Sequence, residues 1–403
     1  MPTLPHVHLD SLFELLGFFN FQEVLEHAAS DLSDDDLMST RTKDSKRKVR
    51  KSDKLLSTYT REELLQALEG SGMLAELQRH GYAHLDLRID VSDPFVHRLV
   101  LTDESLAGQT EQDRNILDGH FRRQNNMRFS DLKLFDSNNA FPVRPQTQDF
   151  LNKEFGDMVL NATVIEFLRL QNPRAPLDQS RALPGQLHPG LGVFRTFTRV
   201  MVSAALRSKR DCLLNHPDFF HNAYINSAGG CVFVNPDMQA LFEILVRDLE
   251  PVIQKKGLGA VSFACSRGDI VALAGASWLL PENTLPDRPD SNTFVWPKHQ
   301  EQIFPIAPTL VSKFSRNSAY RRRVDSLIAT LPTKMFMTRA EFEKMTASED
   351  AAASTTLHVS SSSERHRSHD SDSFVDRRVR YRLKRSGSVT DRLPRIFRWL
   401  FER

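Results

Sequence analysis

Residues 183–194, with the sequence LPGQLHPGLGVF, are the stretch of this chain best suited to bind an anion. They follow an apolar run typical of a buried strand and precede a pattern typical of a helix. Gly190 and Gly192 allow successive backbone N–H groups to approach an anion closely, and the positive end of a helix dipole adds to the attraction. The predicted ligand class is therefore phosphate or pyrophosphate.

Two other interpretations of these glycines follow from the residues alone. The segment has neither the Lys-Ser/Thr pair of a P-loop nor the third glycine of a dinucleotide-binding fingerprint. A lone Gly-x-Gly is also typical of a tight connection between a loop and a helix, with no ligand at all. Both a coenzyme site and a purely structural turn stay open at this point.

Residues 184–234 resemble the coenzyme A site of the general N-acetyltransferase superfamily. In that family a strand leads into a Gln/Arg-x-x-Gly-x-Gly/Ala turn whose amides hold the pyrophosphate. A helix, a strand and a short helix ending before Gly-Phe follow, and here HNAYIN at 221–226 precedes GGCVF at 229–233. The resemblance implies a site for acetyl-CoA or another acyl-CoA. The residues implied to bind it are Gly190, Leu191, Gly192 and Val193.

The match departs from the family at two points. Gln186 stands one residue too early relative to Gly190, and the position of the family's thiolate-protonating tyrosine holds Asn226. An amide side chain cannot act as a general acid. The resemblance therefore implies either an N-acyltransferase or a relative without catalysis, with the acceptor undefined. The candidate catalytic residues are Tyr224, His221 and His188.

Other kinds of reactive site have little support in the sequence. The histidines at 188, 216 and 221 have no standard zinc spacing, so we expect no metal and interpret them as surface, capping or base residues. Cys212 begins an apolar run with nothing to lower its pKa. All three cysteines lie far apart, which favours small core residues in a reducing compartment over disulfides.

Composition limits the class of protein. The 403 residues carry a net charge of +2 and are 40% hydrophobic, which suits a globular core and argues against a globally basic nucleic-acid-binding protein. The sequence contains no run of 18 apolar residues and no basic region before its first apolar stretch. We therefore expect no transmembrane segment and no signal peptide, and we predict a cytoplasmic location.

The elements around the glycine turn predict an α+β fold: a mixed, mainly antiparallel sheet flanked by helices, as in acyltransferases, with a disordered basic C-terminal tail. The predicted divisions are an N-terminal helical segment at 1–38, a basic linker at 39–58, an α/β core at 59–335 and an arginine-rich tail at 346–403.

Periodicity gives the order of elements within the core. Expected strands are 83–89, its hairpin partner 97–102, the buried run 159–170, and two short strands, 212–215 and 231–234. Expected helices are 61–80, 190–208, 219–228 and 237–254, together with a polar helix at 110–124. Residues 261–274 are expected to form a hairpin around Arg267-Gly268-Asp269.

The tail supports a second, non-enzymatic hypothesis. Residues 373–403 combine arginines with Phe, Tyr and Trp, a composition that suits RNA or an anionic membrane surface. A tail that simply docks on its own domain is the alternative. The sequence predicts no oligomeric state.

Overall fold

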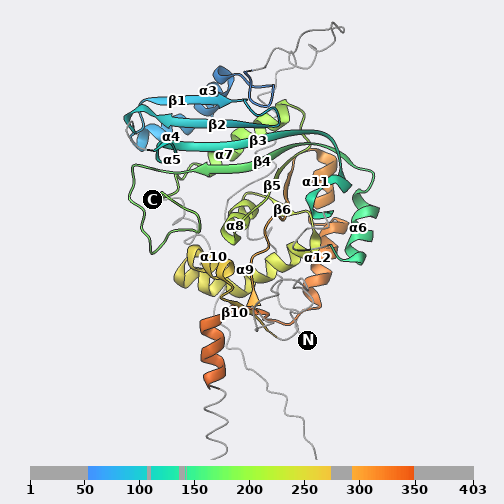
Figure 1. The fold of residues 1–403 in the computed structure, drawn as a ribbon. Helices are drawn as coiled ribbons and strands as arrows, with labels where there is room; N and C mark the ends of the chain where they lie inside the picture. The colour runs from blue at the N-terminus through green and yellow to red at the C-terminus, as the bar shows by residue number, and fades with distance from the viewer. Residues whose placement is uncertain (1–52, 107–109, 136–140, 142, 274–292, 349–403) are drawn as a thin grey trace, which may run out of the picture.

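A computed structural model of the chain describes residues 53–106, 110–135, 141, 143–273 and 293–348. Within these ranges the predicted class is confirmed: the protein is α+β, with a mixed, mainly antiparallel sheet flanked by helices (Figure 1). The helical segment predicted within 1–38, most of the linker at 39–58 and nearly all of the tail at 346–403 lie outside the described residues.

Seven strands form the main sheet, in the order β1-β2-β3-β4-β5-β9-β6. Each neighbouring pair is antiparallel except β4 and β5, which are parallel. A parallel pair needs a crossover, and helix α7 (Phe194–Arg207) supplies it. The strands are β1 (Leu85–Asp90), β2 (Val96–Asp103), β3 (Asn115–Arg128), β4 (Val159–Leu170), β5 (Cys212–Asn215), β6 (Val232–Phe233) and β9 (Gln302–Pro305).

The polar helix predicted at 110–124 is wrong. Only α5 (Glu111–Arg114) is helical there, and β3 begins at the next residue. The charged residues that suggested an exposed helix are paired across the sheet: Arg98 Nε donates to Asp118 Oδ1 at 2.8 Å, and Arg122 Nε donates to Glu166 Oε1 at 2.7 Å. Cross-strand ion pairs therefore allow a charged sequence to form a central strand.

One face of the sheet is covered by α3 (Arg61–Gly70), α4 (Met73–Arg79) and α7, whose leucines and phenylalanines share a core with β1, β2 and β3. The predicted capping box is confirmed, since Thr60 and Glu63 cap α3 reciprocally. The single helix expected at 61–80 is divided in two at Gly72, whose φ of 80° is left-handed.

The opposite face of β4, β5 and β9 packs against α6 (Pro145–Phe155), α11 (Pro308–Phe314) and α12 (Ala319–Ala329). The short 3-10 turn η2 (Glu104–Leu106) follows β2, and the turns η3 (Phe129–Asp131) and η4 (Lys133–Phe135) lie between β3 and α6. Strands β4 and β5 therefore lie between two helical layers.

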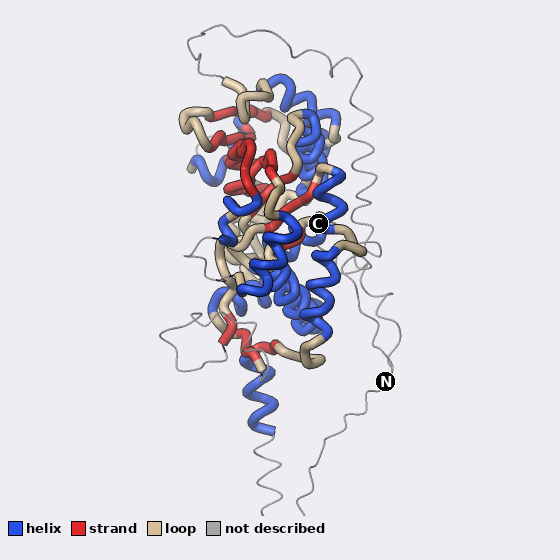
Figure 2. Tube along the Cα trace, turned by 90° about the vertical axis from the view of Figure 1, so that its right-hand side faces the viewer, coloured by secondary structure: helices blue, strands red, loops and turns tan. Residues whose placement is uncertain are grey.

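A second core lies below the large sheet in both views (Figures 1 and 2). It contains α8 (Phe220–Ala228), α9 (Pro236–Lys256) and α10 (Leu258–Arg267), and a small antiparallel sheet of order β10-β7-β8. Rings of Phe220, Phe242 and Trp296 contact one another at its centre. The small sheet's strands are β7 (Ile270–Ala272), β8 (Thr293–Phe294) and β10 (Phe336–Thr338).

The hairpin predicted at 261–274 is also wrong. Residues 261–265 are a short apolar run, which periodicity alone cannot assign, and they lie in α10. Gly268, with φ 78°, ends that helix and is not a hairpin turn. Among the described residues, no helix is both long enough and apolar enough to cross a bilayer.

Asp248 connects α9 to β10 and should contribute strongly to stability. This buried carboxylate accepts hydrogen bonds from the N–H groups of Met335 at 2.7 Å and Phe336 at 3.0 Å, and Arg247 Nε donates to it at 2.7 Å. We expect Asp248→Ala to lower the free energy of unfolding by about 3 kcal/mol, because two buried donors lose their acceptor. Urea denaturation measures this change.

The matched control is Glu76→Ala, which removes an exposed carboxylate paired with Arg79 on α4. We expect a change below about 0.5 kcal/mol there. An equal decrease in the free energy of unfolding in the two variants would show that the buried contacts of Asp248 contribute no more to stability than an exposed ion pair.

Candidate functional site

The main feature of the candidate site is the place where β4 and β5 part. These strands pair only from Ala162 with Cys212 to Ile165 with Asn215. β5 ends at Asn215, while β4 runs on to Leu170 with only β3 as its partner. Among the described residues, the edge of β4 beyond Ile165 therefore has no strand beside it on the β5 side.

A bulge in β4 coincides with this parting point. His120 pairs with Phe167 and Phe121 pairs with Ile165, so Glu166 is an extra residue in β4. A bulge bends a strand and increases its twist, and such bulges are frequent beside functional sites. The bulge thus gives a local reason for β4 to turn away from β5.

The predicted glycine turn lies beside the far end of this open edge. Asn172 N donates to Pro189 O at 2.7 Å and Leu191 N donates to Leu170 O at 3.4 Å, forming a two-residue bridge between Gln171 and Gly190. The bridge attaches the end of the long connection between β4 and α7 to the end of β4. It therefore holds the glycine turn at the end of the β4 edge that is not paired with β5.

The two glycines leave open space at the turn. Both are exposed, whereas the side chains of Leu191 and Val193 are buried. A Cβ added to either Gly190 or Gly192 would meet no atom within 4 Å, and Gly192 has a φ of 81°. The turn is therefore anchored by Leu191 and Val193 and exposes its backbone at the two glycines.

Three backbone donors at the start of α7 have no acceptor among the described residues, and of the three residues Gly192 is exposed, Phe194 is half-buried and Val193 is buried. The N-cap residue Val193 makes no side-chain cap, and the first helical bond at this end runs from Phe197 N to Val193 O at 2.9 Å. Within the described ranges, the N–H groups of Gly192, Val193 and Phe194 have no acceptor, whereas that of Leu191 already has one. Three donors and the positive helix end thus meet in one place.

Three polar residues meet at the parting point itself: Glu166 on β4, His216 immediately after β5, and Glu301 immediately before β9. His216 Nε2 lies 3.5 Å from Glu301 Oε1 and is buried without a hydrogen-bond partner in the described part of the chain. Glu301 Oε2 accepts from Leu134 N at 3.1 Å, which fixes that carboxylate. An imidazole nitrogen is thus held beside a positioned carboxylate.

The charge of Glu166 is maintained by its neighbours. Burial alone would raise the pKa of its carboxyl, but the hydrogen bond and charge of Arg122 lower that pKa overall, with help from Lys133 and His216. The sequence pattern did not single out Glu166, and it left His216 as a surface, capping or base residue. The available signals were a lone carboxylate inside an apolar strand and a histidine at the end of the strand that follows.

The predicted catalytic residues lie in two different places. His188 borders the glycine turn, with Nε2 3.0 Å from Asp113 Oδ1. His221 and Tyr224, both on α8, are buried, and Tyr224 belongs to the second core. Burial lowers the pKa of His221 to about 4, and its Nδ1 lies 2.9 Å from Ser262 Oγ. Burial also raises the pKa of Tyr224.

Asn226, at the family's tyrosine position, has a connecting role. Its Nδ2 donates to Asn215 Oδ1 at 3.1 Å and to Gln302 Oε1 at 3.2 Å. These bonds tie α8 to the ends of β5 and β9. Asn226 therefore supports the edge of the opening opposite β4.

Thiol and metal chemistry have no site in the described residues. Burial raises the pKa of Cys212, and it raises that of Cys231 to about 12, so both thiols stay protonated near neutral pH. No group of three His, Cys, Asp or Glu side chains in the described ranges is arranged to hold a metal ion.

A scan against models of known protein families and a search of curated protein sequences found no match for this chain.

His221 should make stability depend on pH. Its pKa of about 4 in the folded protein is below the ordinary value near 6.5, so between these values the unfolded chain binds the proton more readily. We expect the free energy of unfolding to fall as pH drops from about 6.5 to 4, by up to about 3 kcal/mol from this residue.

Urea denaturation at several pH values tests this prediction. His221→Gln should flatten the curve over that window. The control His80→Gln, at the end of α4, should keep the wild-type slope. An unchanged slope in His221→Gln would contradict the assignment.

Proposed function

We propose that the protein binds an acyl-CoA in the opening between β4 and β5 and transfers the acyl group to an amine. One observation carries this proposal: a parallel strand pair parts after four residues, and the helix that connects the two strands begins at that opening with unoccupied backbone donors. The resemblance of residues 184–234 to N-acetyltransferases points to the same place.

The pyrophosphate of the donor would bind the N–H groups of Gly192, Val193 and Phe194. Backbone donors at a helix start attract anions through hydrogen bonds and the helix dipole together. The absence of side chains at Gly190 and Gly192 leaves room for the phosphate oxygens.

The pantetheine arm of coenzyme A would lie along the open edge of β4. That arm contains amide groups, and the edge of β4 beyond Ile165 has no strand partner on the β5 side. Unpaired strand edges readily form hydrogen bonds with extended amide-containing ligands. The thioester would then reach the parting point near Glu166.

His216 is the proposed general base. Its Nε2 would take a proton from the acceptor amine as the amine nitrogen attacks the thioester carbonyl, and the Glu301 carboxylate would stabilise the imidazolium. Collapse of the tetrahedral intermediate breaks the carbon–sulfur bond. The proton held by His216 then passes to the departing thiolate, so neither Asn226 nor Tyr224 is needed as the acid.

The proposal also covers how the acceptor binds and in which cellular compartment the protein acts. Glu166 lies at the parting point as a carboxylate suited to accept a hydrogen bond from the neutral acceptor amine. The free thiols of all three cysteines fit a reducing compartment such as the cytoplasm. The predicted contact of residues 373–403 with RNA or anionic membrane lies outside the described ranges and stays a prediction.

A matched pair of variants at Gly190 tests the donor site. Gly190 is exposed, its φ is not left-handed, and an added side chain has open space. We expect Gly190→Asp to weaken coenzyme A binding at least tenfold, because the new carboxylate repels the pyrophosphate. Gly190→Asn, with the same size and no charge, should have a clearly smaller effect. Isothermal titration calorimetry of the full chain measures both.

Failure of the wild-type protein to bind coenzyme A at millimolar concentration would remove the donor site. Equal binding by the aspartate and asparagine variants would place the pyrophosphate elsewhere.

A second test separates binding from chemistry. With acyl-CoA donors of several chain lengths and a panel of primary amines, we expect His216→Gln to lower kcat by about 10²- to 10⁴-fold while the Kd for coenzyme A stays unchanged. Release of free thiol gives the rate. His80→Gln serves as the control and should keep wild-type activity.

Wild-type activity in His216→Gln would exclude this residue as the base. Tight coenzyme A binding without thiol release by the wild-type protein, across the panel, would identify a relative without catalysis.

A further inference from the structure

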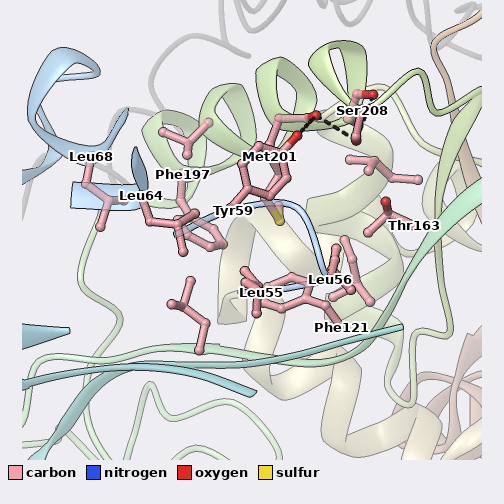
Figure 3. A pocket seen from close by; sticks show the side chains of 16 residues that line it. Leu55, Leu56, Tyr59, Leu64, Leu68, Phe121, Thr163, Phe197, Met201 and Ser208 are labelled. Atoms are coloured by element: carbon pink, nitrogen blue, oxygen red, sulfur yellow. Dashed lines mark hydrogen bonds between the residues drawn. The ribbon is translucent and has the colours of Figure 1, made fainter. Parts of the chain in front are cut away.

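An apolar cavity of about 60 Å³ lies between α7 and the main sheet. It is bounded by α7 on one side, by β2 to β5 on the other, and by the start of the described chain and α3 (Figure 3). Protein interiors are normally packed with few voids larger than a water molecule. A cavity of this size is therefore a candidate binding site.

The lining of the cavity suits an uncharged, apolar ligand. None of its side chains is charged, and most are aliphatic or aromatic. The hydroxyl of Tyr59 donates to the carbonyl of Ala204, and Ser208 Oγ donates to the same carbonyl at 2.9 Å. These two hydroxyls thus already have a partner, as Figure 3 shows. A hydrocarbon chain would lose no hydrogen bond on entering.

The cavity begins where β4 and β5 part. Thr163 and Ile165 on β4, and Leu213 on β5, form part of its wall, and Ile165 is the last β4 residue paired with β5. At the other side Phe197 lines the cavity one turn beyond the glycine turn. The cavity therefore reaches the parting point from the α7 face of the sheet, where the acyl chain would lie, whereas His216 and Glu301 approach that point from the opposite face.

A short turn covers the cavity. Leu55 and Leu56 contribute side chains to it, and the turn is closed by a bridge between Leu55 and Tyr59. Leu56 and Ser57 adopt left-handed φ values of 53° and 57°, which are unfavourable for these residues. The N–H of Leu56 donates to His97 Nδ1 at 2.7 Å and holds the turn in place.

The volume of the cavity limits the length of the acyl chain that it can hold. At roughly 10–15 Å³ for each group the size of a water molecule, 60 Å³ accommodates about four to six such groups, which fits the five carbons of a hexanoyl chain that lie beyond its carbonyl carbon. We infer that the cavity binds the acyl chain of the donor, so that the donor is a medium-chain acyl-CoA and not acetyl-CoA. This inference rests on the proposed function.

Calorimetric titration of the full chain with four ligands tests it: coenzyme A, acetyl-CoA, hexanoyl-CoA and palmitoyl-CoA. We expect hexanoyl-CoA to bind at least tenfold more tightly than acetyl-CoA, because each methylene placed in an apolar site favours binding. Palmitoyl-CoA should gain nothing over hexanoyl-CoA, since its chain exceeds the cavity.

Two variants on α7 give matched controls. Ala205→Leu fills the cavity and should abolish the preference for hexanoyl-CoA, while coenzyme A itself binds as to the wild type. Ser203→Leu, the same side chain on the same helix but outside the lining, should keep the preference. Thermal unfolding confirms that each variant is folded, and the wild-type comparison stands even if one is not.

The outcomes separate the two proposals. Equal affinity for acetyl-CoA and hexanoyl-CoA would overturn this inference and leave the donor site intact. No binding of any of the four ligands would overturn both. Free hexanoate binding as tightly as hexanoyl-CoA would assign the cavity to a free fatty acid and would overturn its role in the donor site.

Discussion

The candidate site depends on how the backbone hydrogen bonds of β4 are satisfied. On one side β4 pairs with β3 along most of its length, but on the other it pairs with β5 over four residues and then meets the glycine turn only at Leu170. Between these points its edge has no strand partner. Unpaired backbone groups are costly unless water or a ligand satisfies them, so this edge is a natural binding surface.

The connection between β4 and β5 places the start of α7 at one end of this edge. A parallel pair requires a crossover, and the crossover helix must begin near the end of the first strand and return to the start of the second. The positive end of α7 is therefore placed at the mouth of the opening. Glu166, His216 and Glu301 lie where β4 and β5 part, so the proposed pyrophosphate and acceptor amine would bind at different points along one strand edge.

Much of this architecture was predictable from the sequence because the elements around the site have clear patterns. The strands at 159–170 and 212–215 have the predicted bounds, and the helices after them begin and end within a few residues of expectation. In contrast, β3 was missed because its charges are neutralised by Arg98 and Glu166 on neighbouring strands. Such partners are distant in sequence and leave no local signal.

The polar residues at the place where β4 and β5 part were unpredictable for a related reason. His216 and Glu301 are 85 positions apart and meet only because β5 and β9 are neighbours in the sheet. The glycine turn, by contrast, is local, and its exposed backbone and buried Leu191 and Val193 follow from residues in one short segment. A turn built from one short segment was therefore predictable from the sequence, whereas a cluster assembled by the order of strands in the sheet required the structure.

The central claim is that amides at the start of α7 bind the pyrophosphate of coenzyme A. Amide hydrogen exchange of the full chain, with and without saturating coenzyme A, tests it most directly. The account predicts that exchange at Gly192, Val193 and Phe194 slows on binding, while exchange in α4 is unchanged. Binding of coenzyme A with unaltered exchange at these three amides would contradict it.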